Sequence, residues 1–222
     1  MIGLRYASKS RDGLRLISAA ALFGLAGICH AQSPAKVQDT GVDANPPSIT
    51  ACVACHGALG AGTVSGGPRL AGMNPDYLAH ALTMFKAGTR AGDAMQAVAR
   101  NLSDSDIQRL AMFFSQQNPP LAAGAAPPSQ SLVMAGKQLA ETGAAPAVPA
   151  CFSCHAAGGK GNGARFPGIA GEPAAFVVAR LHEFQARAKA KTPAPGSMTA
   201  VAATLNDTQI EEAAAYLSVT RP

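Results

Sequence analysis

The chain has 222 residues, of which 48% are apolar, 5% aromatic and 14% charged, with 23 Gly, 16 Pro and no Trp. This apolar content with a low net charge excludes a disordered chain. The lack of a glycine period and of repeated long apolar runs excludes a collagen and a polytopic membrane protein. A formal charge of +5 and five cysteines at first suggest a basic surface and an unpaired thiol.

The N-terminus has the pattern of a secretory signal. Four basic residues precede an apolar stretch at 16–28, and small residues stand at −3 and −1 of a cleavage site after Ala31. This stretch of 13 residues is shorter than the roughly 20 that span a bilayer, which favours a cleaved signal peptide over residues 1–31. Its removal takes Cys29 with it and leaves a formal charge of +2 and four cysteines. We therefore expect a periplasmic protein that binds no nucleic acid.

The remaining chain repeats itself. Four blocks recur in the same order, namely 52–57 and 151–156, 68–72 and 167–171, 77–85 and 176–184, and 95–102 and 198–205. The offset is 99 for the first three blocks and 103 for the last, and we place the four additional residues in a Lys/Pro-rich loop at 188–196. Four ordered matches predict an internal duplication.

The segment between the copies, NPPLAAGAAPP at 118–128, is typical of a linker, because tandem prolines cannot continue a helix. The predicted organisation is a flexible tail at 32–44, a first domain at 45–117, a linker at 118–130 and a second domain at 131–222.

Both copies are predicted to be helical. Tyr77, Ala81, Met84 and Phe85 stand at helical spacing, and no segment shows sustained period-two alternation. The segments 103–106 and 206–209 resemble capping boxes that begin the last helix of each copy. The apolar faces of these helices are Ile107, Leu110, Ala111 and Phe114 in one and Ile210, Ala213, Ala214 and Leu217 in the other. The expected fold is all-α.

Each copy contains Cys-x-x-Cys-His, and four chemistries can use such a cysteine pair. A thioredoxin-like pair would stand near βαβ units, a zinc site would need four ligands in a tetrahedron, and structural disulfides leave the following histidine without a role. In haem c attachment, two thiols add to the porphyrin vinyl groups and the histidine becomes an axial iron ligand. The motifs therefore predict two covalent haem c groups, held by Cys52, Cys55 and His56 and by Cys151, Cys154 and His155.

The opposite axial ligand is predicted to be a methionine. Met95 and Met198 occupy matching positions in the repeat, in what we expect to be loops eight residues before the last helix. A thioether raises the reduction potential relative to a second histidine, and a six-coordinate iron passes electrons but does not readily bind oxygen or peroxide.

The other candidates for axial ligation have no repeat partner. We interpret Met84 and Met112 as core residues of predicted helices, because methionine on an apolar stripe usually fills space. His80 and His182 do not align with each other, and we interpret them as surface or hydrogen-bonded histidines.

The paired CxxCH motifs, the PRLAG and PGIAG segments, YLAHALTMFKAGTR, and the helix starts LSDSDI and LNDTQI resemble the di-haem class I c-type cytochromes, most closely the cytochrome c4 family. The resemblance covers residues 48–217. It implies two tandem class I cytochrome c domains, each wrapped around one haem. It also implies that the carbonyls of Pro68 and Pro167 accept hydrogen bonds from the proximal histidines.

The expected function is that of a periplasmic electron carrier and not an enzyme, passing single electrons from a cytochrome bc-type complex or a dehydrogenase to a terminal oxidase or reductase. Its partners would be redox proteins that dock transiently, with membrane association only through partner complexes. The first alternative is a haem-bearing subunit of a larger periplasmic dehydrogenase or reductase. A di-haem peroxidase is a third interpretation, but it would need one iron without its methionine.

Overall fold

The computed structural model describes residues 49–122 and 126–222, which all belong to one compact unit. The predicted signal peptide (1–31), the tail (32–44) and the first residues of the predicted first domain lie outside the described residues. Helices dominate the described residues, which hold no strand and only two isolated β-bridges. The prediction of an all-α fold is confirmed. None of the described helices is long and apolar enough to cross a membrane.

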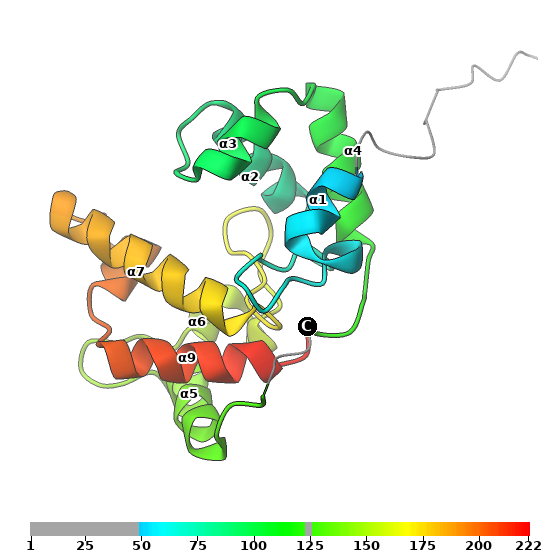
Figure 1. Ribbon diagram of the computed structural model, residues 1–222. Coiled ribbons are helices and arrows are strands. Elements are labelled where there is room, and N and C mark those ends of the chain that lie inside the picture. Colours follow the sequence, from blue (N-terminus) through cyan, green and yellow to red (C-terminus); the bar gives the residue numbers. More distant parts are fainter. Residues whose placement is uncertain (1–48, 123–125) are drawn as a thin grey trace, which may run out of the picture. The chain divides into compact units, whose positions relative to one another are not determined.

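The first copy contains four α-helices and one short 3-10 helix (Figure 1). They are α1 (Ile49–His56), η1 (Ala58–Gly60), α2 (Pro75–Lys86), α3 (Asp93–Ala99) and α4 (Asp104–Ser115). Helix α2 packs against both α3 and α4. The core between them consists of Met73, Leu78, Ala79, Ile107, Leu110, Ala111 and Phe114.

The second copy contains five α-helices and the matching 3-10 helix (Figure 1). They are α5 (Gln130–Thr142), α6 (Phe152–His155), η2 (Ala157–Gly159), α7 (Ala174–Ala190), α8 (Met198–Ala202) and α9 (Asp207–Val219). Helix α9 packs against α5 and α7, and α8 packs against α7. The main core of this copy consists of Val177, Leu181, Ala202, Ile210, Ala214 and Leu217.

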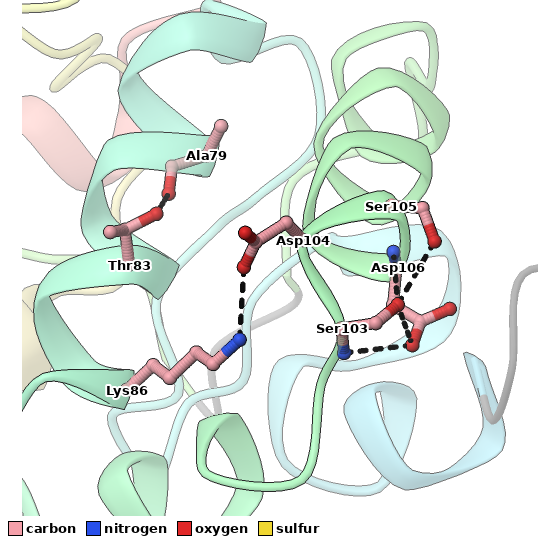
Figure 2. A network of polar contacts seen from close by, with 7 residues as sticks. All are labelled: Ala79, Thr83, Lys86, Ser103, Asp104, Ser105 and Asp106. Atoms are coloured by element: carbon pink, nitrogen blue, oxygen red, sulfur yellow. Dashed lines mark hydrogen bonds and ion pairs between the residues drawn. The ribbon is translucent and has the colours of Figure 1, made fainter.

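The apolar faces predicted for the last helix of each copy are buried at every position, between 0% and 4% exposed. The predicted capping boxes are also present. The Ser103 hydroxyl accepts from the amide of Asp106 at 3.1 Å, while the Asp106 carboxylate accepts from the amide of Ser103 at 2.9 Å (Figure 2). Asn206 and Gln209 exchange the same pair of bonds. The exposed pair between Lys86 and Asp104, at 2.9 Å, joins the end of α2 to the start of α4 (Figure 2).

The two copies have the same pattern of backbone hydrogen bonds in their loops. In each copy one glycine carbonyl of the 3-10 helix accepts from two successive amides of the following loop, and a later glycine amide donates to the last helix. In the first copy the amides of Leu70 and Ala71 donate to the carbonyl of Gly60, and the amide of Gly72 donates to that of Phe114. In the second copy the amides of Ile169 and Ala170 donate to the carbonyl of Gly159, and the amide of Gly171 donates to that of Leu217. The sequence repeat therefore corresponds to a repeat of the backbone.

The structure corrects three expectations. Met95 and Met198 stand in the short helices α3 and α8, and not in loops. Part of the predicted loop at 188–196 continues α7 as helix as far as Ala190, so that α7 has 17 residues where α2 has 12. Helix α5 begins at Gln130, capped by the Ser129 hydroxyl, inside the predicted linker. In the first two cases the chain is helical although the sequence there has no hydrophobic period.

Candidate functional site

Each Cys-x-x-Cys-His motif lies on one turn of helix. Cys52 lies in the middle of α1, which ends with Cys55 and His56. Cys151 directly precedes α6, which ends with Cys154 and His155. None of the four cysteines in the described residues forms a disulfide. The first of each pair is half-buried and the second exposed, and burial raises the pKa of the Cys52 and Cys151 thiols.

The two histidines are held in the same way. Nδ1 of His56 lies 2.9 Å from the carbonyl oxygen of Pro68, and Nδ1 of His155 lies 2.8 Å from that of Pro167. Because a carbonyl can only accept, the ring proton stands on Nδ1 and the lone pair on Nε2. This is the contact that the family resemblance implies for the two prolines, and it occurs in both copies.

Burial keeps both rings neutral. His56 is 7% exposed and His155 5% exposed, and this burial lowers both pKa values, while the hydrogen bond to the proline carbonyl partly offsets it. A neutral imidazole with a free Nε2 is the form that binds iron. Each motif thus offers two thiols and one metal-binding nitrogen.

The chain turns sharply directly after each histidine. Gly57 has φ 74° and ψ 168°, and its repeat partner Ala156 has φ 60° and ψ 166°. In the first copy the turn is also tight, because a Cβ on Gly57 would stand 2.4 Å from the carbonyl oxygen of Gly62. This turn returns the chain toward the loop that carries Pro68 or Pro167, as the bonds from Gly62 and Gly161 to the histidine carbonyls show.

The two methionines of the repeat are half-buried near the start of their helices. Met198 is the first residue of α8, where the Ser197 hydroxyl caps the helix by accepting from Ala200 at 3.2 Å, and its side chain packs against the core of the second copy. Met95 lies on α3, which packs on α2. The structure thus places both in short helices that pack on the helix following the motif loop.

The other histidines and methionines that were considered as axial ligands do not occupy equivalent positions in the two copies. His80 and His182 are exposed on α2 and α7, as expected. The interpretation of Met112 as a core residue is wrong, because its side chain is 51% exposed, while Met84 is half-buried. The face of α4 that carries Met112 is opposite the buried one.

The sequence analysis did not single out Arg90, which follows α2. Its guanidinium lies 4.7 Å from the Phe85 ring centre and donates to the Tyr77 hydroxyl at 3.5 Å, while its Nε is buried without a hydrogen-bond partner. A buried cationic nitrogen without an acceptor fits an anionic group such as a haem propionate. Arg90 ends the YLAHALTMFKAGTR segment that carries part of the family resemblance, but a single arginine after a helix is common and nothing in the sequence indicates its burial.

These residues fit a haem. Two small helical copies present paired thiols, a neutral histidine oriented by a carbonyl, and a half-buried methionine, and the first copy adds a cation with an unused donor. This combination defines a tandem c-type cytochrome.

Comparison with known proteins agrees with that class. The family model for cytochrome c oxidase, cbb3-type, subunit III matches residues 48–114, and the cytochrome c model matches residues 133–220. The thiosulfate dehydrogenase electron acceptor of Thiomonas intermedia is 35% identical over 182 residues, which are 79% of this chain and 81% of that protein. Cytochrome c4 of Azotobacter vinelandii is 32% identical over 213 residues, or 91% and 96% of the two chains.

A solved structure extends the comparison to the fold. Reduced recombinant cytochrome c4 from Pseudomonas stutzeri superposes with a TM-score of 0.69 at 30% identity, covering 81% of this chain and 98% of that one. The chain belongs to the cytochrome c4 family of di-haem class I c-type cytochromes. It consists of two tandem cytochrome c domains, carries two covalently bound haem c groups and is a di-haem electron carrier.

Proposed function

We propose that the two haems are attached through Cys52 and Cys55 in the first domain and through Cys151 and Cys154 in the second. His56 and His155 are the proximal ligands, and Met95 and Met198 the distal ones. The pair of histidine-to-proline hydrogen bonds, which leaves Nε2 free in both domains, carries the proximal assignment. The matching repeat positions and half-burial of the two methionines support the distal one. The first domain extends over 45–117 and the second over 131–222 together with Ser129 and Gln130, which begin α5, so that the linker is 118–128.

Each haem supplies one reversible one-electron couple at its iron. The protein residues attach each haem and orient the groups that bind its iron. The cysteine thiols would hold the edge of the ring through thioether bonds, and the methionines would supply the second iron ligand. The carbonyls of Pro68 and Pro167 fix the orientation and basicity of the imidazoles. With a histidine and a methionine to bind the iron in each domain, the sites would suit electron transfer and not peroxide or oxygen chemistry, so the protein is a carrier and not an enzyme.

The carrier acts in the periplasm and exchanges electrons with redox proteins in brief encounters. Its donor is a cytochrome bc-type complex or a dehydrogenase, and its acceptor a terminal oxidase or reductase. The signal pattern over 1–31 and the resemblance to cytochrome c4 support this placement. Small, charge-steered contacts suit such exchange, because the complex must dissociate after each electron.

A second candidate has a specific observation in its favour. The Thiomonas intermedia relative carries the name of an electron acceptor of thiosulfate dehydrogenase, and it is 35% identical to this chain. On this proposal the chain is the electron-accepting partner or subunit of a periplasmic dehydrogenase. Co-purification in a stable complex would favour this candidate over the free carrier.

The test of the site assignment is replacement of a distal methionine. Met198→Ala should leave two haems per chain, counted as pyridine haemochromes, but lower the reduction potential of the second haem markedly, because loss of the thioether removes a ligand that favours Fe(II). A redox titration of the purified holoprotein measures it.

Met134→Ala is the matched control, since Met134 lies in the same domain and is 58% exposed. It should leave both potentials at the wild-type values. A Met198→Ala protein with unchanged potentials would contradict the distal assignment, and fewer than two haems in the wild type would contradict the attachment sites.

A further inference from the structure

One peptide group beside the first motif is hydrogen-bonded at both ends. The carbonyl oxygen of Pro68 accepts from Nδ1 of His56 at 2.9 Å, and the N–H of Arg69, which belongs to the same peptide, donates to Oε2 of Glu172 at 2.9 Å. Hydrogen bonds in such a chain polarise one another, because negative charge at the N–H end increases the negative charge on the carbonyl oxygen. Glu172 is thus connected to the histidine of the other sequence copy.

The connection is shielded from water. Arg69 and Glu172 are each 2% exposed. The Arg69 guanidinium is engaged by carbonyl oxygens, those of Ala71 at 3.2 Å, Pro119 at 3.0 Å and Pro120 at 3.5 Å. Among the described residues no ion pair includes Glu172. Its carboxyl therefore acts on the Pro68–Arg69 peptide with little screening.

The second copy has no equivalent. The repeat partner of Glu172 is Met73, an apolar core residue of the first copy. The carbonyl of Pro167 accepts from His155 at 2.8 Å, but within the described residues the N–H of Gly168 in the same peptide has no hydrogen-bond partner. The two histidines therefore differ in what lies behind their carbonyl acceptor.

We propose that Glu172 is a positioning residue that selectively tunes the first haem: its charge, transmitted through the Pro68–Arg69 peptide, strengthens the hydrogen bond from His56 and lowers that haem's reduction potential. This rests on the proposed function, because it takes His56 as the proximal ligand. A more strongly hydrogen-bonded Nδ1–H makes the imidazole a stronger donor to iron, which favours Fe(III). The second haem lacks this influence.

The charge on Glu172 changes in an accessible pH range. Burial raises its pKa to about 8, while the Arg69 amide and the positive charges of Arg69 and Arg90 act in the opposite direction. The carboxyl is thus largely neutral at pH 6 and ionised at pH 9.5. The potential of the first haem should fall as the pH rises through this range, and that of the second should fall less.

The experiment uses the holoprotein and titrates each haem separately, following its resolved NMR signals at pH 6 and pH 9.5. Glu172→Gln keeps an oxygen acceptor without the charge. It should match the wild type at pH 6, shift the first haem's potential upward at pH 9.5, and remove most of its pH dependence. Glu211→Gln, an exposed charge on α9, is the control and should change neither haem selectively.

Two results would overturn the proposal. The first is an unchanged first-haem potential in Glu172→Gln at pH 9.5, and the second is an equal shift of both haems, which would indicate a general charge effect. If the variant fails to fold, an NMR titration of the wild-type protein still tests the proposal. The NMR signal of the His56 Nδ1–H should titrate near pH 8 and that of His155 should not, and a His56 signal without that titration also overturns the relay.

Failure of the relay and failure of the site assignment are distinguishable. The haemochrome count and the Met198→Ala titration test the ligands and do not depend on Glu172. A protein with two haems and a methionine-dependent potential, but no effect of Glu172→Gln, would keep the proposed function and reject this inference.

Discussion

At the scale of single residues, the turn after the histidine of each motif shows that two different residues can adopt the same backbone geometry. The first domain uses Gly57, and the second uses Ala156 at nearly the same φ and ψ. A positive φ is open to glycine but strains alanine. In the described residues only Leu59 and Ala156 are non-glycine residues with positive φ, so the strain is confined to these motif loops.

Ala156→Gly should therefore stabilise the holoprotein. Relief of the strained φ contributes on the order of 1–3 kcal/mol, and the greater chain entropy of glycine in the unfolded state costs about 0.5–1 kcal/mol. We expect a net gain of about 1 kcal/mol in the free energy of unfolding, measured by guanidinium denaturation. Ala157→Gly, at an ordinary φ, should instead lose stability, and a gain there would show that the effect is not strain relief.

At the scale of elements, the crossing of α5 and α9 depends on one glycine. A Cβ on Gly136 would stand 1.9 Å from the carbonyl oxygen of Glu212 on α9, so the two backbones approach as closely as they do only because this position has no side chain. Leu139 of α5 and Ala213 of α9 pack beside this contact. The close approach positions the helix that precedes the second motif.

The substitution Gly136→Ala tests whether the close contact between α5 and α9 outweighs the higher helix propensity of alanine. Propensity alone would favour alanine by about 1 kcal/mol, but the clash is with backbone, which cannot rotate away. We expect a net loss on the order of 1–3 kcal/mol in the free energy of unfolding. Gln138→Ala on the exposed side of the same helix is the control and should change stability little; equal effects of the two changes would contradict the packing argument.

At the scale of the whole molecule, Glu172 couples the stability of the fold to pH. Its pKa is raised from the ordinary value of 4.5 to about 8 by burial. Between these values the folded protein holds a proton that the unfolded chain has released, so the free energy of unfolding falls as the pH rises. The contribution is complete below pH 4.5 and is lost as the pH passes through about 8.

Glu172→Gln should remove this slope. We expect the wild-type free energy of unfolding to decline between pH 5 and pH 8.5 more steeply than that of the variant, with the variant the more stable of the two at pH 9, because no charge is then buried. Denaturant titrations of the holoproteins across this range measure it. Parallel pH profiles would contradict a raised pKa for this carboxyl.

The sequence by itself determined the class of the protein. The two CxxCH motifs, the four ordered repeat blocks, and the capped, periodic helices α4 and α9 are local features, because covalent attachment, helix capping and a 3.6-residue period all act within a few neighbouring positions. These features were sufficient to predict an all-α fold and two haems. The family resemblance added the carbonyls of Pro68 and Pro167.

Only the tertiary structure decided the features that depend on packing between distant segments. Met95 and Met198 lie on short helices, because α3 and α8 are stabilised by contact with α2 and α7 and not by a hydrophobic period of their own. The exposure of Met112 depends on which face of α4 its neighbours cover. The contact between Arg69 and Glu172 joins residues 103 positions apart through a backbone amide, which every residue but proline possesses, so no pattern in the sequence could have indicated it.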